Sequence, residues 1–361
     1  MTVRHTASSP LSLPDSPPGG GPLSSAFSVY GFEFRLAGTS EQAIAGIASD
    51  FAYFQAPESV AGSPLPFVLE LNEGAPSYEG LPVCDASAYT PRNVVYRAHG
   101  QRLLDYGGRG LGTLDESARR FSMTSEDADL VYEAAYLFLL SRIGEHLDAQ
   151  RLHRLHALAM SFRGRSILVL LPMGGGKSTL GAELLKHPDT RILSDDSPII
   201  ARDASALAYP LRLGLLKGRE GEIPPEYVRL IQRMEFGPKF LVDYSYFAAR
   251  VTAEAQPGLL LLGHRTLSAT PRLEPAPYRA AMRAMLPNLI VGLGLFQGLE
   301  FVLGRSYREI WSKLGIGLSR LRNAHALARH SHCYDFHMGR DLGANAAAVI
   351  ALAEKTFAAQ P

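Results

Sequence analysis

The stretch Ser166–Thr179, which reads SILVLLPMGGGKST, joins a strand pattern to a glycine-rich turn and a lysine. Its first six residues form a β-branched and leucine run, as expected for a central strand buried on both faces. Consecutive glycines let backbone N–H groups close on phosphate oxygens, and the helix predicted over Leu180–Lys186 adds partial positive charge. The pattern predicts a phosphate-binding loop in an α/β domain. Lys177 then reaches the β- and γ-phosphates, and the Ser178 hydroxyl can bind Mg²⁺.

An acidic pair, Asp195 and Asp196, follows a strand predicted over Arg191–Leu193. Asp195 comes 18 residues after Lys177, which is enough for one helix and a return strand beside the loop. Sheets of α/β proteins bind ligands at the carboxyl ends of their strands. Alternating side-chain directions can aim one carboxylate at a metal and the other at a reacting hydroxyl, and repulsion between the two can raise one pKa to suit a general base.

The composition excludes several classes of protein. The chain has 361 residues, with 36 Lys and Arg against 35 Asp and Glu, and this balance argues against general nucleic-acid binding. Two cysteines cannot form a disulfide framework and fit a reducing compartment. The first 25 residues lack the apolar stretch of a secretion signal, so a cytoplasmic protein is expected. The most apolar stretch, Met285–Gly304, is interrupted by polar residues and is interpreted as a buried helical segment, not a membrane span.

Composition and periodicity divide the chain into three parts. Residues 1–26 are rich in Pro, Gly and Ser and are predicted to form a disordered tail. Residues 27–150 are predicted to form a smaller α/β domain for packing or recognition, and residues 151–361 are predicted to hold the chemistry. The strands predicted for the smaller domain are Phe27–Leu36, Pro66–Leu71, Asn93–Ala98 and Arg102–Tyr106. A long helix follows, with Ser125 as the expected N-cap.

The region His156–Asp196 resembles the catalytic core of the HPr kinase/phosphorylase-like protein serine kinases. That family places a histidine before a two-stranded hairpin, then the phosphate loop, then a strand ending in Asp-Asp. His156 comes 21 residues before Lys177, and Gly164 falls in the turn of the predicted hairpin, Leu158–Phe162 and Ser166–Leu171. The resemblance implies a phosphoenolpyruvate-carboxykinase-like P-loop kinase domain. The layout is most similar to the kinases of lasso-peptide and other peptide-tailoring clusters, which phosphorylate a serine of a precursor peptide.

The chain departs from the family pattern at several positions. Leu171 replaces the first glycine of the loop, and the Asp-Asp pair comes one residue later than in the bacterial regulators. The family's later Glu-x-Arg-Gly signature is reduced in Pro210–Gly214 to Arg212 and a shifted glycine. A metal or phosphate contact of the family is therefore lost here or comes from another residue.

The resemblance also implies roles for individual residues, with ATP and Mg²⁺ as the cofactors. The implied nucleotide-binding residues are Gly174, Gly175, Gly176, Lys177, Ser178 and Thr179. Ser178 and Asp196 would bind the metal and Asp195 would take the proton of a serine hydroxyl, or the two aspartates exchange roles. His156 would lie near the phosphate or the acidic pair, with a structural histidine as the alternative. The neighbouring His153 is expected at the surface.

Extra cations are expected around a transferred phosphoryl group, because its charge spreads over the equatorial oxygens. The candidates, in order, are Arg212, Lys239 and the pair His264-Arg265. A second basic region, residues 278–330, has eight basic residues against two glutamates. Its helical face can steer an acidic peptide or small protein through residues such as Arg320 and Arg322, or it is a solvated face balanced elsewhere.

The last feature is a group of potential metal ligands, His330, His332, Cys333 and His337. Their spacing matches no common zinc pattern, and they are interpreted as part of a strand over His332–Met338. A helix over Gly343–Phe357 is predicted to follow.

The sequence thus predicts Mg·ATP-dependent phosphorylation of a serine hydroxyl on a peptide or small protein, with GTP or pyrophosphate open as donors. The resemblance further implies a ring-like homo-oligomer. Three alternatives stay open: a kinase of a small hydroxylated metabolite, an ATP-hydrolysing switch, and a nucleotide-binding scaffold without catalysis.

Overall fold

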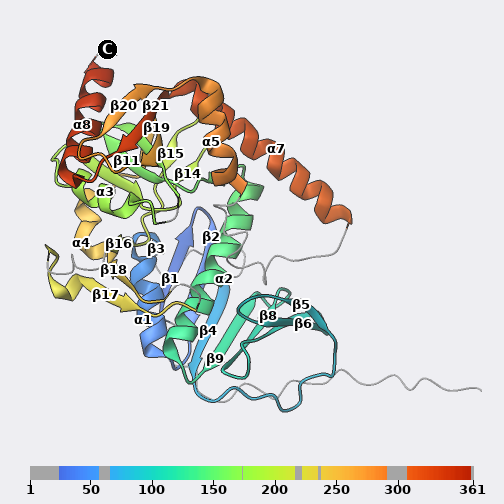
Figure 1. Cartoon of the computed structure of the whole chain (residues 1–361). Helices are drawn as coiled ribbons and strands as arrows, with labels where there is room; N and C mark the ends of the chain where they lie inside the picture. The colour runs from blue at the N-terminus through green and yellow to red at the C-terminus, as the bar shows by residue number, and fades with distance from the viewer. Residues whose placement is uncertain are drawn as a thin grey trace, which may run out of the picture.

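The computed structural model describes residues 24–56, 66–172, 174–215, 222–234, 237–290 and 307–358. These residues form a mixed α/β structure with three sheets and helices packed on them. Figure 1 shows the N-terminal elements in the lower half of the view and the C-terminal elements in the upper half. The predicted α/β class is therefore confirmed.

The first sheet is formed by residues 24–125, and its nine strands have the order β3-β1-β2-β4-β9-β8-β7-β6-β5. They are β1 (Ser24–Val29), β2 (Phe32–Ala37), β3 (Gln55–Ala56), β4 (Phe67–Glu73), β5 (Ala86–Tyr89), β6 (Val94–Ala98), β7 (Gln101–Asp105), β8 (Gly110–Asp115) and β9 (Arg120–Ser125). The strands β2, β4 and β9 are parallel, and the other pairs are antiparallel. A long helix, α2 (Ala128–Ala149), packs on β4 and β9, and α1 (Glu41–Asp50) lies beside it (Figure 1).

Several strand predictions for this half are confirmed. The strand predicted over Pro66–Leu71 is β4, and the strands predicted over Asn93–Ala98 and Arg102–Tyr106 are β6 and β7, which pair as a hairpin. Its turn is formed by His99 and Gly100, which have φ values of 50° and 81°. Positive φ at both central turn residues matches the twist of the two flanking strands.

The single strand predicted over Phe27–Leu36 is wrong, because this stretch is the hairpin of β1 and β2. Tyr30 and Gly31 form its turn, with φ values of 50° and 88°. Buried and half-buried residues alternate on both sides of that turn, so periodicity alone did not reveal it. Residues 24–26 of the predicted tail belong to β1, and residues 1–23 lie outside the described residues.

The predicted N-cap of α2, Ser125, is also wrong. The N-cap is Asp127, whose carboxylate accepts hydrogen bonds from the backbone N–H groups of Asp129 and Leu130 at 3.0 and 3.2 Å. Ser125 ends β9 instead, and its hydroxyl donates to the Arg109 carbonyl at 2.6 Å. An ionised carboxylate is the better acceptor at the positive end of a helix.

The second sheet is formed by residues 153–338 and positions the phosphate-loop motif. Its strands are β10 (His153–Arg154), β11 (Leu158–Phe162), β12 (Arg165–Leu170), β13 (Thr190–Ser194), β14 (Ile199–Ile200), β15 (Ala206–Leu207), β19 (Glu254–Arg265), β20 (Arg272–Pro275) and β21 (His332–Met338). The strands β12, β19 and β21 are parallel neighbours, and β11 lies antiparallel between β12 and β13. The carboxyl ends of β12, β13, β19 and β21 therefore meet at one edge. The hairpin predicted over Leu158–Phe162 and Ser166–Leu171 and the strand predicted over His332–Met338 are confirmed.

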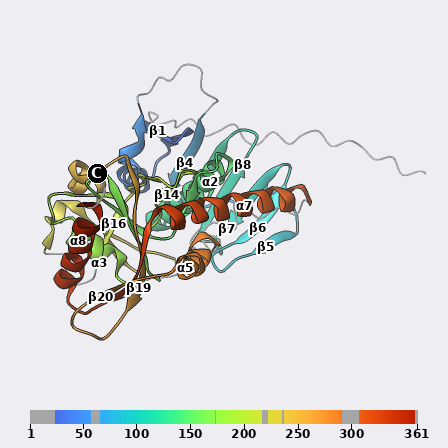
Figure 2. The same ribbon diagram turned by 90° about the horizontal axis from the view of Figure 1, so that it is seen from above.

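Helices cover both faces of this sheet (Figures 1 and 2). On one face, Ile167 and Val169 of β12 pack with α3 (Lys177–Leu184) and α8 (Leu342–Ala358). On the other face, Leu168 and Leu170 pack with α5 (Tyr278–Ile290) and α7 (Tyr307–His330). Burial on both faces explains the unbroken apolar run of β12. In Figure 1 the N-terminal end of α7 projects away from the sheet.

A third, small sheet lies between the other two in Figure 1. Its antiparallel strands have the order β16-β18-β17. They are β16 (Leu213–Leu215), β17 (Val228–Ile231) and β18 (Lys239–Val242), followed by the short helix α4 (Tyr244–Phe247). Single 3₁₀ turns occur at Ala52–Phe54, Pro225–Tyr227 and Ala248–Arg250.

The two predicted domains share one hydrophobic cluster. Phe54 and Ile143 from the N-terminal half pack in the same cluster as Tyr209 and Leu241 from the C-terminal half. A buried acid at the end of α1, Asp50, lies at this junction. Its carboxylate accepts hydrogen bonds from Tyr132 at 2.6 Å, from Arg212 at 3.1 Å, and from Arg229.

Within the described residues, no helix is both long enough and apolar enough to cross a membrane. The stretch interpreted as a buried helical segment, Met285–Gly304, is described only as far as Ile290, where α5 ends. Met285 and Leu289 are buried against the second sheet, as that interpretation requires. Residues 291–304 lie outside the described residues.

Replacement of Asp50 by Asn should lower the free energy of unfolding by about 3–5 kcal/mol, because it removes the buried counter-charge of Arg212 and leaves Arg229 only its pair with Asp243. Urea denaturation of the full chain measures this change. Asp189→Asn is the matched control, since its pair with Arg163 is exposed and should contribute less than about 1 kcal/mol. Equal effects of the two substitutions would contradict the prediction.

Candidate functional site

The predicted site residues other than Arg212 converge at the carboxyl-end edge of the second sheet. The phosphate-loop motif follows β12, the acidic pair follows β13, and His264 and Arg265 end β19. His156 precedes β11, which runs in the opposite direction, so its position is at the same edge. The strand arrangement alone therefore brings four separate pieces of chain together.

The glycine-rich turn has the backbone conformation that its sequence predicts. Gly174 and Gly176 have φ values of 73° and 102°, a region in which L side chains are strained. Gly176 is the N-cap of α3, so the first N–H groups of that helix are directed toward the loop. A Cβ at Gly175 would lie 2.9 Å from the Pro172 carbonyl oxygen, to which the Gly175 N–H donates. The turn therefore tolerates no side chain at its centre.

Lys177 is buried, with its side chain 7% exposed. Its ammonium group donates to the Leu171 carbonyl oxygen at 2.7 Å and to His156 Nε2 at 2.9 Å. An ammonium group cannot accept, so Nε2 accepts and the ring proton resides on Nδ1, which lies 3.2 Å from Asp196 Oδ1. Lys177, His156 and Asp196 thus form one chain of contacts, and burial lowers the pKa of both the lysine and the histidine.

Asp195 and Asp196 have different surroundings although they are adjacent. Asp195 is buried, and one of its oxygens, Oδ2, accepts from the Ser178 hydroxyl at 2.6 Å and from the Gly214 N–H at 3.0 Å. Its other oxygen, Oδ1, is buried without a hydrogen-bond partner among the described residues. Burial raises the pKa of Asp195. The side chain of Asp196 is 63% exposed and lies on the side of His156 and Lys177.

The donor set around Asp195 fits a magnesium ion. Mg²⁺ in phosphate sites binds one or two carboxylates together with phosphate oxygens and water. The Ser178 hydroxyl and the unpartnered Oδ1 of Asp195 provide oxygen ligands beside the loop. Within the described part of the chain, no group of three or more His, Cys, Asp or Glu side chains could hold a metal without such added ligands.

Two cations lie close to the loop and the acidic pair. Lys239, at the start of β18, interacts electrostatically with Asp195, and burial lowers its pKa. A Cβ at Gly214 would lie 2.8 Å from Lys239 Nζ and 3.0 Å from Ser178 Oγ, so these groups lie against one another. A Cβ at Gly176 would lie 3.3 Å from a guanidinium nitrogen of Arg265, which places that arginine at the loop.

Arg212, the first candidate cation of the sequence, is engaged elsewhere. Its guanidinium group donates to Asp50 and Tyr132 and stacks on the ring of Tyr136, 3.7 Å from the centroid. Arg212 comes two residues before Gly214, so its contacts fix the start of β16. The second and third candidates, Lys239 and Arg265, are the cations that the fold brings to the site.

The surroundings of His264 and His153 differ from those of the site cations Lys239 and Arg265. His264 lies 3.5 Å from Asp335 and stacks on His337, at a centroid distance of 5.5 Å. The prediction that His153 is at the surface is wrong, because its side chain is fully buried between Asp148 and Ser319.

The sequence did not reveal two groups that shape the site. The Gly214 N–H holds Asp195, and the Leu171 carbonyl, at the position of the missing first glycine, accepts from Lys177. Any residue type can provide a backbone group, so these two contacts leave no motif in the sequence. The only indication of the Gly214 N–H was the shifted glycine that follows Arg212. The Asp50 contact to Arg212 spans 162 residues and has no local sequence signal.

Comparison of the chain with protein-family models and with curated proteins finds no match in either case. The chemistry of the site therefore rests on its own geometry.

The chain of contacts through His156 predicts opposite shifts of its pKa in two variants. Lys177→Met removes a neighbouring positive charge and should raise the pKa, whereas Asp196→Asn removes a negative charge and should lower it. An NMR titration of the imidazole Cε1–H signals measures both shifts, with His156→Gln assigning the signal. Shifts of the same sign in the two variants would contradict the contact chain.

Proposed function

We propose that this protein is a Mg·ATP-dependent kinase that transfers the γ-phosphoryl group to a hydroxyl of a peptide or small protein. The observation that carries the proposal is the buried Oδ1 of Asp195, which has no hydrogen-bond partner among the described residues and lies beside the Ser178 hydroxyl, directly next to a glycine-rich turn. A buried acceptor atom without a partner is costly, and a bound cation would satisfy it. The resemblance of His156–Asp196 to the HPr kinase/phosphorylase-like kinases supports the same function. It also adds a phosphoenolpyruvate-carboxykinase-like fold to the proposal.

The loop and its neighbours would bind the triphosphate. The backbone N–H groups of the Gly174–Gly176 turn and the first turn of α3 provide hydrogen-bond donors for phosphate oxygens. Lys177 would exchange its carbonyl contacts in the turn for the β- and γ-phosphates. Arg265 and Lys239 would add positive charge from two sides, which offsets the charge that develops on the transferred group.

The surroundings of the two aspartates favour the exchanged assignment, in which Asp195 binds the metal and Asp196 takes the proton. Asp195 contacts Ser178, so these two residues would hold Mg²⁺, which when bound neutralises charge on the β- and γ-phosphates. Asp196 is exposed and can reach an incoming hydroxyl. In the transfer, the hydroxyl oxygen forms a bond to the γ-phosphorus, the bond to the bridging oxygen of ADP breaks, and Asp196 takes the hydroxyl proton. His156, through its Nδ1–H, would hold Asp196 in position.

Binding of Mg·ATP to the purified full chain is the first test, measured by isothermal titration calorimetry. Lys177→Met should weaken binding at least tenfold, about 1.4 kcal/mol, because it removes the buried cation at the phosphates. Lys186→Met is the matched control, since this lysine is 64% exposed and pairs with Glu183 just beyond α3. Absence of Mg·ATP binding by the wild-type protein would contradict the proposal.

Phosphoryl transfer is tested with peptides encoded beside this gene, incubated with the protein and Mg·ATP and analysed by intact mass. A kinase adds the mass of one phosphate to one peptide. Asp196→Asn should keep Mg·ATP binding and reduce turnover by about 10²–10⁴-fold, the usual contribution of a general base. ATP hydrolysis without peptide modification would instead support a switch or a metabolite kinase, and binding without turnover would support a scaffold.

The metal role of Asp195 has a separate readout. Asp195→Asn should abolish binding of Mn²⁺·ADP, followed by electron paramagnetic resonance, without lowering the stability of the unliganded protein, because it removes a buried charge. Because its folded-state pKa is raised above 3.8, ionisation of Asp195 opposes folding, and wild-type stability should fall relative to the variant as pH rises above that value. A variant that binds Mn²⁺·ADP normally would reject this role.

A further inference from the structure

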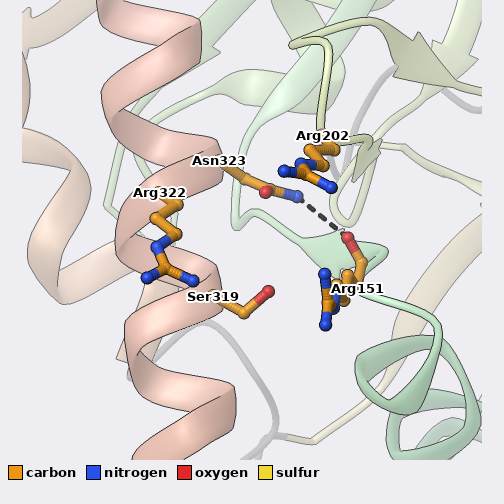
Figure 3. A pocket seen from close by; sticks show the side chains of 5 residues that line it. All are labelled: Arg151, Arg202, Ser319, Arg322 and Asn323. Atoms are coloured by element: carbon orange, nitrogen blue, oxygen red, sulfur yellow. Dashed lines mark hydrogen bonds between the residues drawn. The ribbon is translucent and has the colours of Figure 1, made fainter.

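Three arginines surround a small cavity away from the phosphate loop. Arg151, Arg202 and Arg322 line a cavity of about 80 Å³ together with Ser319 and Asn323 (Figure 3). Arg151 follows α2, Arg202 lies in the turn between β14 and β15, and the other three residues belong to α7. The cavity has room for several water molecules or for one carboxylate or phosphate group.

The walls of this arginine cavity are fixed by buried hydrogen bonds. The Asn323 amide is 2% exposed and donates to the carbonyl oxygens of Arg151 and Ile200, both at 3.0 Å. Buried His153 lies between Asp148 and Ser319, with both contacts at 2.8 Å. Three separate segments are thereby held in register around the cavity, so its shape does not depend on a bound ligand.

The three cavity arginines are exposed side chains that have no ion-pair partner within the described part of the chain. The nearby carboxylate of Asp148 pairs with His153 and Arg320, and none of the three cavity arginines forms an ion pair with any described residue. Guanidinium groups keep their charge at any physiological pH, so three of them without a counter-charge attract an anion. Arg320, which the sequence predicts to contact an acidic partner, pairs with Asp148 instead.

The backbone of Arg151 closes the end of α2. Its φ is 61°, and its N–H donates to Asp148 while that of Leu152 donates to Leu147, the hydrogen bonds of a Schellman motif. Glycine or asparagine is the usual residue at this position, since other side chains are strained there. Replacement of Arg151 by glycine therefore suits this backbone.

The arginine cavity is connected to the acidic pair by two short strands. In the β10–β14 pairing, His153 is opposite Ile200, and the ladder continues with the Leu155 N–H bonded to the Pro198 carbonyl. Asp196 begins the second of these segments, and Arg202 comes six residues later. At about 3.3 Å per residue, the Cα atoms of Asp196 and Arg202 are at most about 20 Å apart.

We infer that the arginine cavity binds an acidic side chain of the phosphoacceptor peptide, at most about six residues from the hydroxyl that is phosphorylated. A fully extended peptide of six residues covers the largest separation that the chain allows between Asp196 and Arg202. This inference rests on the proposed function, from which it takes the position of the acceptor hydroxyl. The cavity would then select peptides by the spacing between the hydroxyl and the acid.

Fluorescence anisotropy with labelled peptides tests the inference on the full chain. Each peptide carries one serine and a pair of glutamates. One to eight alanines separate the serine from this pair, and the serine stands either before or after it. Affinity should be highest at a spacing of five alanines or fewer, should decrease at longer spacings and should fall with added salt. The substitutions Arg151→Gly, Arg202→Gln and Arg322→Gln should each lower the affinity for the tightest-binding peptide about tenfold. This is the usual effect of losing one charged hydrogen-bonding partner. Arg329→Gln, exposed on the same helix, is the matched control and should change nothing.

Two additional readouts separate the possible failures. Arg151→Gly should leave thermal stability unchanged or raised, and none of the three variants should alter Mg·ATP affinity. If Mg·ATP binds but affinity does not depend on spacing or on these arginines, the inference is overturned and the proposed function stands. If inorganic phosphate displaces the peptide equally at every spacing, the cavity is a small-anion site. If the peptides bind as expected but Mg·ATP does not, the proposed function fails instead.

Discussion

The hydrogen bonds to one oxygen of Asp195 hold the candidate site together. The Ser178 hydroxyl comes from the helix after the glycine-rich turn, the Gly214 N–H comes from the small sheet, and Asp195 itself ends β13. These segments are distant in sequence, and the shared acceptor joins them where the strand pairing brings them together. The other oxygen of Asp195 is left buried and unpartnered, and this asymmetry within one carboxylate is the physical basis for proposing a cation there.

The position of Gly214 depends in turn on a junction far from the loop. Asp50 pairs with Arg212 and Arg229 in a buried environment, Asp243 adds a second carboxylate to Arg229, and Arg212 precedes Gly214 by two residues. The first sheet therefore contributes to the site by fixing the start of β16, although none of its strands reaches the phosphate-loop edge. A buried acid with two arginines is costly to disrupt, which makes it suited to positioning.

The outcome for the candidate cations illustrates why sequence alone ranked them poorly. Arg212 lies near the family motif in sequence, yet its side chain turns toward Asp50, 162 residues earlier. Lys239 and Arg265 follow no motif, and they reach the site because β18 pairs with β16 and β19 pairs with β12. Long-range strand pairing decides these positions, and it leaves only weak local patterns. The same holds for His153, which is polar in sequence but buried between two elements.

The sequence by itself determined the strand, glycine-rich turn and helix of the loop, the strand before the acidic pair, and the α/β class, because these depend on local periodicity and on the conformational freedom of glycine. The resemblance of His156–Asp196 to a kinase family also brought His156, Lys177 and the acidic pair into one hypothesis. Only the tertiary structure decided that the two aspartates have different surroundings, which cations face the loop, and that three arginines from distant segments share one cavity. Burial and charge pairing arise between segments that meet only in the fold, so no local pattern encodes them.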